Sequence, residues 1–168
     1  RSLQDSLYTL TIQPRLEEED LLKPIKRIVD GQLADGLIIG QTRTDDSRVR
    51  YLQQQQFPFV TFGRTKLPKP HPFYDVRHEW ITKDSVYRLS KLGHQRIGLI
   101  NPPEELNYSR HRLDGFLTGL ENCGLCFQKE MQVSTDLSFE AGRRVLKQFM
   151  ELPNPPTAIV SPSVSTTL

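Results

Sequence analysis

Short apolar runs alternate with longer amphipathic segments along most of this 168-residue chain. The runs are bounded by glycine or proline, which is typical of strands buried inside a sheet. The longer segments repeat apolar residues at intervals of three and four, which indicates helices that cover such a sheet. This alternation predicts an α/β fold in which parallel sheets carry helices on both faces.

The pattern places each expected element. Strands are expected at residues 8–12, 34–39, 58–62, 96–100, 131–133 and 156–160, with a short extended piece at 73–75. Helices are expected from Asp20 to a stop at Gly31, from Asp45 or Asp46 through Gln56, and at 77–92, 107–123 and 139–150. Asp20, one of Asp45 and Asp46, and Asn107 are the expected caps of three of these helices, because short polar side chains favour that position. The last residues, 161–168, read as a loop that leads into a helix, and the chain opens within what looks like a helix, so we expect pieces to be missing at both ends.

Composition and charge exclude several classes of protein. Apolar residues make up 36% and charged residues 25% of the chain, which is typical of a soluble globular protein. The sequence has no apolar run long enough to span a membrane, and its first ten residues lack the apolar core of a signal peptide. The net charge is only +2 and the basic residues are scattered, so this piece is not expected to contact DNA directly.

The two cysteines form a C-x-x-C pair at Cys123 and Cys126. A redox pair of this type begins a helix, where the helix dipole lowers the thiol pKa, but these cysteines flank Gly124 at the expected end of a helix. A zinc site would need two further ligands nearby, and the sequence offers none. We therefore interpret them as two ordinary thiols near a turn, and so few cysteines fit the reducing cytoplasm.

No catalytic motif is present. The nucleophile elbow, the phosphate-binding loop, the dinucleotide-binding glycine pattern and the zinc-protease motif are all missing. The four histidines lack metal-ligand spacing, and His94 follows the glycine that stops a helix. Glu104 and Glu105 are adjacent in a loop without a matching base. We therefore expect a protein that is not an enzyme and that uses no metal and no cofactor.

The ends of the expected strands indicate where a ligand would bind, because parallel α/β sheets bind ligands at their carboxyl edge. The loops concerned cover residues 40–42, 62–64, 101–107 and 161–163. Gln41 lies in the first of these loops. Arg112 lies one turn into the helix after the third, where its guanidinium could grip vicinal hydroxyls or a carboxylate. An equally good interpretation makes Arg112 a surface residue paired with Asp114 or Glu121.

Five motifs follow one another along the chain: A-D-G-L-I-I at 34–39, F-P-F-V-T-F-G-R at 57–64, L-G-H-Q-R-I-G-L-I at 92–100, R-L-D-G-F at 112–116 and P-T-A-I-V at 156–160. Together they resemble the effector-binding core of the lactose/galactose-repressor family. The resemblance extends over nearly the whole chain. It covers a little over half of the family's ligand-binding module and none of its N-terminal helix-turn-helix.

The resemblance implies a two-lobed fold like that of periplasmic binding proteins. Residues 1–94 would form the first lobe, and residues 95–168 would form an incomplete second lobe. It also implies a cytoplasmic homodimer that holds a small-molecule effector, often a sugar, in its cleft. Such a protein contacts operator DNA through an N-terminal domain absent from this chain.

The family's ligand positions can be carried over to this sequence. Arg112 matches the arginine that grips ligand hydroxyls, Tyr108 matches a ligand-facing position, and Leu137 stands where relatives often place an aromatic residue. Five further positions depart from the family: Gly63 stands where many relatives have an aspartate, Ser163 and Val164 stand where an Asn-Asp pair is usual, and Arg77 and His78 stand where an Asp-Asn pair is common. Missing aspartates and added basic residues predict an anionic effector, such as a sugar phosphate or sugar acid; the alternative is that the chain has drifted and binds no sugar well.

Two other functions remain open at this point. A periplasmic sugar-binding protein of a transporter would share the fold, so the fold cannot separate it from a regulator. The sequence upstream of this chain would discriminate them, and the G-H-x-R-I and R-x-x-G-F motifs favour the regulator. A flavodoxin-like enzyme would need a nucleophile or an acid–base pair, and none was found in the sequence.

Overall fold

The expected alternation of strands and helices is present in the computed structural model, which describes residues 6–13, 20–163 and 166. The elements are α1 (Leu22–Asp30), β1 (Leu37–Ile39), α2 (Ser47–Gln54), β2 (Phe59–Phe62), β3 (Phe73–Tyr74), α3 (His78–Lys91), β4 (Ile97–Asn101), α4 (Asn107–Asn122), a 3-10 turn at Lys129–Met131, β5 (Gln132–Ser134), α5 (Phe139–Met150) and β6 (Ala158–Val160). The α/β class and the five helices expected between Asp20 and residue 150 are confirmed, whereas the helix expected where the chain opens falls on residues outside the described ranges. The strand expected at 8–12 is wrong, because these residues form no strand.

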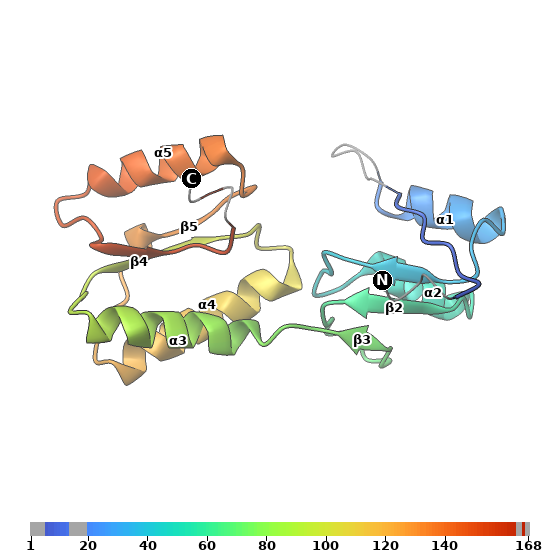
Figure 1. The fold of residues 1–168 in the computed structure, drawn as a ribbon, viewed down its shortest axis with the longest axis horizontal. Helices are drawn as coiled ribbons and strands as arrows, with labels where there is room; N and C mark the ends of the chain where they lie inside the picture. Colours follow the sequence, from blue (N-terminus) through green and yellow to red (C-terminus); the bar gives the residue numbers. More distant parts are fainter. Residues whose placement is uncertain (1–5, 14–19, 164–165, 167–168) are drawn as a thin grey trace. The chain divides into compact units, whose positions relative to one another are not determined.

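The strands form two parallel sheets (Figure 1). The first has the order β1-β2-β3, with Ile38 beside Val60 and Phe62 beside Tyr74. The second has the order β5-β4-β6, with Ile100 beside Val133. In both sheets the strand ends that precede the loops therefore share one edge, as the alternation requires.

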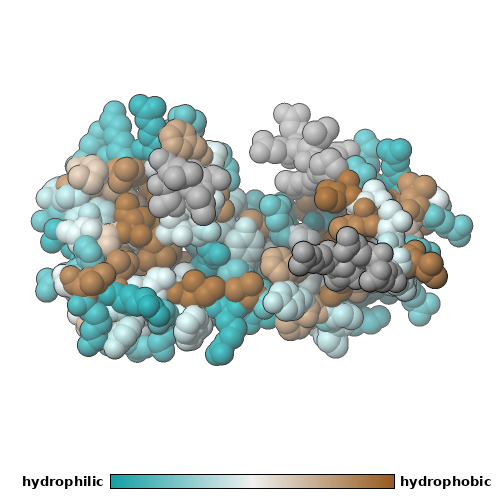
Figure 2. Space-filling view, in the orientation of Figure 1, coloured by the Kyte–Doolittle hydropathy of each residue, from teal (hydrophilic) through white to brown (hydrophobic). Residues whose placement is uncertain are grey.

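Both faces of the second sheet are covered by helices (Figure 1). On one face α3 and α4 pack against a core that joins them to β4, made of Val86, Ile97, Leu99, Phe116 and Leu120. On the other face α5 contributes Val145 and Phe149, which pack with Ile100. This double cover explains why every residue of β4 is buried. The outward side of α5 is mostly hydrophilic (Figure 2).

Helices α3 and α4 approach each other closely because two glycines of α4 face α3. A Cβ atom at Gly115 would collide with the backbone oxygen of Glu79, and one at Gly119 would lie 2.9 Å from the Cβ of Val86. The hydroxyl of Thr82 donates a 2.8 Å hydrogen bond to the backbone oxygen of Arg112 across this contact. The position of α4, and of the side chains at its start, is therefore set by backbone-to-backbone packing.

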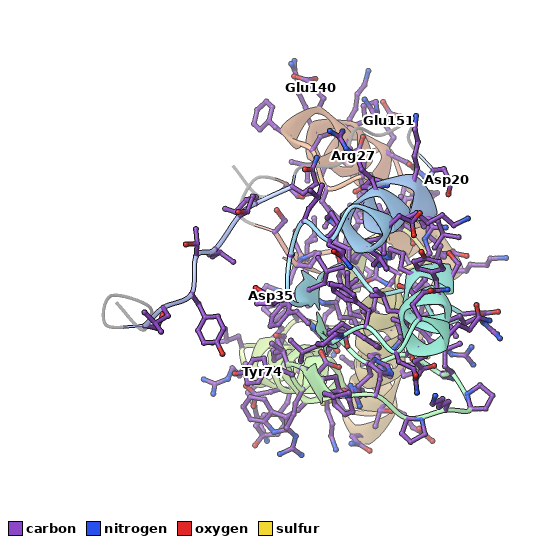
Figure 3. The ribbon with its side chains drawn as sticks, turned by 90° about the vertical axis from the view of Figure 1, so that its right-hand side faces the viewer. Asp20, Arg27, Asp35, Tyr74, Glu140 and Glu151 are labelled. Carbon is purple, nitrogen blue, oxygen red and sulfur yellow. The ribbon has the colours of Figure 1, made fainter. Side chains whose placement is uncertain are left out.

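The chain divides into two compact units: residues 1–36 with 47–58, and residues 37–46 with 59–168. Within the first unit, the hydroxyl of Tyr51 on α2 donates to Asp30 at the end of α1 over 3.1 Å. The side chain of Asp20 accepts a hydrogen bond from the backbone of Leu22, and Arg27 lies in the last turn, so charges of the favoured sign stand at opposite ends of α1 (Figure 3). The second unit contains both sheets and runs through His94; a division into lobes at this residue remains a prediction.

No helix in the described parts of the chain combines the length and the apolar character needed to cross a membrane.

Candidate functional site

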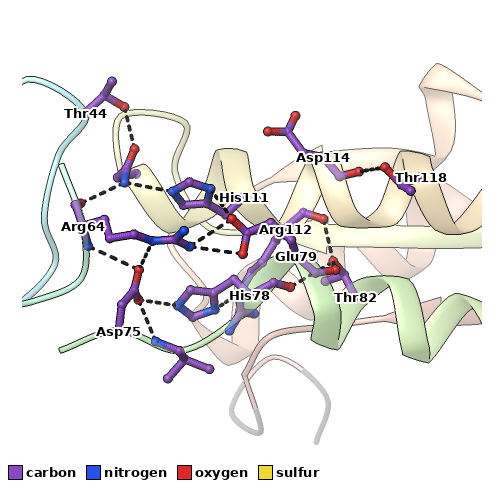
Figure 4. Close-up of polar contacts among 12 residues, drawn as sticks. Thr44, Arg64, Asp75, His78, Glu79, Thr82, His111, Arg112, Asp114 and Thr118 are labelled. Atoms are coloured by element: carbon purple, nitrogen blue, oxygen red, sulfur yellow. Dashed lines mark hydrogen bonds and ion pairs between the residues drawn. The ribbon is translucent and has the colours of Figure 1, made fainter. Parts of the chain in front are cut away.

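A cluster of polar side chains joins segments of the second unit that are far apart in sequence (Figure 4). We call it the polar network. Its members are Thr44, Arg64, Asp75, Glu79, Asn107 and His111. The first three follow β1, β2 and β3, and the others lie in the first turns of α3 and α4. Parallel topology brings these segments together, since strand ends and helix starts meet at one edge.

Arg64 is the central cation of the polar network. Its Nε donates to Asp75 Oδ2 over 2.6 Å, and its Nη2 donates to the two Glu79 oxygens over 2.9 and 3.1 Å. The Asp75 side chain is only 8% exposed, so its charge is compensated inside the protein. Burial lowers the pKa of Arg64, but the hydrogen bonds to Asp75 and Glu79 outweigh burial and raise it. Arg64 is therefore used structurally, as a clamp between the segment after β2 and the start of α3.

Asn107 and His111 extend the polar network along α4. The Asn107 amide nitrogen donates to the Arg64 backbone oxygen over 2.8 Å and lies 3.0 Å from His111 Nε2. His111 Nδ1 lies 2.8 Å from Glu79 Oε1. The expected cap at Asn107 is wrong: this residue is the first of α4, and its side chain binds these tertiary partners instead.

Beside the polar network lies a second group, the arginine cluster, formed by Arg112, Tyr108 and His78. Arg112 Nε donates to His78 Nδ1 over 3.3 Å, and its guanidinium carbon lies 5.6 Å from the centre of the Tyr108 ring. The rings of Tyr108 and His78 are 5.4 Å apart. Tyr108 and Arg112 are one turn apart on α4, so the structure brings together these two predicted ligand residues, with His78 as a third partner.

Arg112 carries its charge in a half-buried position. Burial lowers the pKa of its guanidinium, against a smaller opposing effect of Tyr108. Among the described residues it pairs with no carboxylate, so the surface pairing with Asp114 or Glu121 is not present. A guanidinium that lacks a protein counter-charge in a partly buried place can offer its remaining N–H groups to a ligand.

The other predicted ligand residues lie on the loops that the strand-end rule selected. Gln41 is exposed, lies two residues after the end of β1 and has a φ of +50°. Leu137 is half-buried before α5 with φ +63°, and its backbone N–H donates to Thr135. Ser163 is half-buried and its backbone oxygen accepts from Ser161 over 3.4 Å, whereas Val164 lies outside the described residues. Their role toward a ligand remains a prediction.

Gly63 is buried and has a backbone that an aspartate would strain. Its φ is +117°, and a Cβ atom there would collide with the Thr42 hydroxyl, which donates to the Arg64 backbone over 3.0 Å. The conformation of this loop therefore favours glycine at position 63. Arg77 is exposed and lines a shallow groove of about 300 Å³ along α3 and α4, away from the contacts that define the arginine cluster.

The sequence pattern missed most of the polar network. The strand-end rule did select the loops that contain Arg64 and Asn107. Asp75, Glu79 and His111 gave no local signal, because a carboxylate or imidazole near the start of a helix is usually solvated. Cys123 and Cys126 are unbonded thiols, half-buried and exposed. The described residues contain no group of three or more potential metal ligands.

We expect the folded protein to lose stability as the pH falls from about 7 to 5. Burial lowers the pKa of His78 and of His111, and the nearby Arg112 and Arg64 respectively lower it further. Unfolded histidine titrates near pH 6.5, so below that pH the unfolded chain binds more protons and unfolding is favoured. Urea midpoints measured at pH 7.5, 6 and 5 should fall in that order. The fall should be smaller in His111→Gln, and a midpoint constant over this range would contradict the expectation.

A second loss is expected at lower pH. Burial alone would raise the pKa of Glu79, but its own backbone N–H, His111 and Arg64 together lower it. A carboxylate with a depressed pKa stabilises the fold above its unfolded pKa and stops doing so as the pH falls through its folded pKa. The polar network therefore stabilises the fold most at neutral pH.

Comparison with known proteins gives one consistent result. Residues 5–167 match the family model described as periplasmic binding proteins and sugar binding domain of LacI family. The transcriptional regulator AglR of Rhizobium meliloti is 33% identical over 146 residues, which are 86% of this chain and 41% of that protein. The transcriptional repressor CytR of Escherichia coli is 29% identical, over 80% of this chain and 39% of its own length.

Solved structures agree with this. A regulatory protein of the LacI family from Chloroflexus aggregans superposes with a TM-score of 0.79 at 25% identity, over 92% of this chain and 56% of that one. This chain spans only about two fifths of the length of the curated relatives AglR and CytR.

Proposed function

The chain belongs to the family of periplasmic binding proteins and LacI-type sugar-binding domains, and from this membership we propose that it forms the effector-binding core of a DNA-binding transcription regulator. AglR is named as a helix-turn-helix transcriptional regulator and CytR as a helix-turn-helix transcriptional repressor. The periplasmic and enzymatic alternatives are therefore not favoured. In the proposed assembly, a domain outside this chain binds operator DNA, two copies form a homodimer, and the protein works in the cytoplasm.

One observation carries the proposal of a ligand site: the half-buried Arg112 guanidinium lies against Tyr108 and has no carboxylate partner among the described residues. Leaving a cation partly desolvated is unfavourable unless something compensates the charge. A ligand that supplies oxygen atoms to the open N–H groups would do so. The aromatic face of Tyr108 adds an apolar wall of the kind that sugar rings contact.

The positive charge of Arg112 and the lack of an acidic side chain at Gly63 support an anionic effector. The resemblance to the family implies that Gly63 stands where many relatives have an aspartate, and Gly63 cannot be replaced by aspartate without strain. A site that keeps an uncompensated arginine and lacks this acceptor favours a phosphate or carboxylate over a neutral sugar. We propose a sugar phosphate or a sugar acid as the effector class.

The test is calorimetric titration of the purified protein with glucose, glucose 6-phosphate and gluconate as probes. The two anionic probes should bind at least about tenfold more tightly than glucose, because hydrogen bonds to charged groups contribute about 1.5–3 kcal/mol each. Arg112→Gln should lower the affinity for the anionic probes by about tenfold or more. Arg110→Gln, an exposed arginine on the same helix, is the matched control and should change nothing.

Two outcomes would overturn the proposal. A preference for glucose over both anions would refute the anionic effector. Equal effects of the Arg112 and Arg110 substitutions would refute the assignment of the site to Arg112.

A further inference from the structure

We infer that His78 is a positioning residue that holds the Arg112 guanidinium in place, and that Asp75 fixes His78 for this task. The inference rests on the proposed ligand site at Arg112 and names the side chains that orient it. Its starting point is a chain of contacts across three segments: Asp75 Oδ1 lies 3.5 Å from His78 Nε2, and His78 Nδ1 accepts from Arg112 Nε over 3.3 Å.

These two contacts select one form of the imidazole. Arginine has only donors, so His78 Nδ1 must carry a lone pair to accept from Arg112. The proton of the neutral ring then sits on Nε2, which is the nitrogen that faces the Asp75 carboxylate. Asp75 therefore stabilises the tautomer that Arg112 requires. The same logic orients histidines in catalytic triads and metal sites.

Asp75 is itself immobilised. Its Oδ1 accepts from its neighbour's backbone, Val76 N–H, over 2.8 Å, and its Oδ2 accepts from Arg64 Nε over 2.6 Å. The carboxylate is 8% exposed and the His78 side chain is 12% exposed, so neither can rotate freely into solvent. The polar network thus fixes Asp75, and Asp75 fixes the orientation of His78 in the arginine cluster.

The contact uses only Nε of Arg112. Tyr108 lies against the guanidinium and also against the His78 ring, which restricts both side chains to one arrangement. The terminal Nη groups of Arg112 form no hydrogen bond with the described residues. Because His78 holds the guanidinium by Nε, the two Nη groups stay available for a ligand in a fixed orientation. A guanidinium that is already oriented loses less conformational entropy when a ligand binds.

Other charged groups surround His78. Glu79 and His111 also face it, from α3 and α4. Asparagine Oδ1 occupies nearly the place of histidine Nδ1, so it can accept from Arg112 but cannot reach Asp75. This difference separates the two contacts of His78 experimentally.

The first test does not depend on any ligand. Long-range ¹H–¹⁵N spectra of the full chain at pH 7.5 report which imidazole nitrogen of each histidine carries the proton. We expect His78 to be neutral with its proton on Nε2. A proton on Nδ1, or a doubly protonated ring, would overturn the inference, because neither form can accept from Arg112 Nε.

The second test uses gluconate and glucose 6-phosphate as probes. His78→Leu removes the acceptor and should weaken binding by about fivefold or more, whereas His78→Asn keeps an acceptor and should recover most of the affinity. His94→Leu is the matched control, because His94 also makes one side-chain contact, 3.0 Å to Thr157, and should leave the affinity unchanged. Unfolding midpoints of all variants identify any that lose the fold.

The two proposals fail in different ways. If His78→Leu and His78→Asn bind the probes equally, or as well as the unaltered chain, while Arg112→Gln does not bind, the positioning role is wrong and the effector site stands. If Arg112→Gln also binds normally, the effector site is wrong, and the tautomer measurement still decides the contact between His78 and Arg112.

Discussion

Replacing Gly115 with alanine is expected to destabilise the second compact unit by about 3 kcal/mol, at the upper end of what overpacking of a core costs. An added Cβ would collide with the backbone oxygen of Glu79 and with the hydroxyl of Thr82. Backbone atoms cannot rotate aside as a long side chain can, so α3 and α4 would have to separate. Their separation would also open the core between them.

Urea denaturation followed by the fluorescence of the single tryptophan, Trp80 on α3, measures this loss. Gly40→Ala is the control, because a Cβ at Gly40 meets nothing within 4 Å. That substitution should change the free energy of unfolding by less than about 0.5 kcal/mol. If the two alanine variants were equally stable, the close approach of α3 and α4 would not be a feature of the protein in solution.

The second large effect is expected for Asp75→Ala, which should cost about 3 kcal/mol. The side chain is 8% exposed, and its oxygens accept from Arg64 Nε and from the backbone of Arg64 and Val76. Removing it leaves a partly buried guanidinium and two backbone N–H groups with fewer acceptors. Removal of one partner from a buried ion pair typically costs about 3–5 kcal/mol, and the lower figure applies because Arg64 is 34% exposed.

Asp84→Ala is the matched control. Asp84 forms an ion pair of the same length, 2.6 Å, with Arg88 Nε, but that arginine is 73% exposed. Surface pairs of this kind contribute less than about 1 kcal/mol, because water and salt screen both charges. We therefore expect a clear difference between two substitutions that remove the same side chain from bonds of equal length. Similar losses would mean that the polar network is solvated.

The sequence predicts a strand correctly where the strand is buried and its residues therefore form an apolar run. Residues 97–100 form an uncharged, mostly apolar run because helices cover both faces of the second sheet, and β4 begins there. Residues 8–12 alternate threonine with larger apolar residues and were expected to form a strand as well. Yet Tyr8, Leu10 and Ile12 are 74%, 63% and 82% exposed. Strand propensity has little meaning without a neighbouring strand, and the pattern contains no information about neighbours.

The candidate site also contains some residues that the sequence could predict and others that it could not. Arg112 could be proposed from the strand-end rule, which selects the start of α4, and Tyr108 was added only by the resemblance to the family; one turn of α4 carries both. The contacts of Asn107 could not be predicted, because asparagine favours a helix cap and only tertiary partners override that preference. Asp75 and Glu79 meet Arg64 across 11 and 15 residues, a distance over which no periodicity acts.

One oxygen in the polar network serves two contacts at once. Glu79 Oε1 binds both Arg64 Nη2, over 2.9 Å, and His111 Nδ1, over 2.8 Å. Because Glu79 lies on α3, this carboxylate joins the segment after β2 to α4 through a third element. Loss of the carboxylate would therefore break both contacts together, whereas loss of Arg64 or of His111 would break only one of the two.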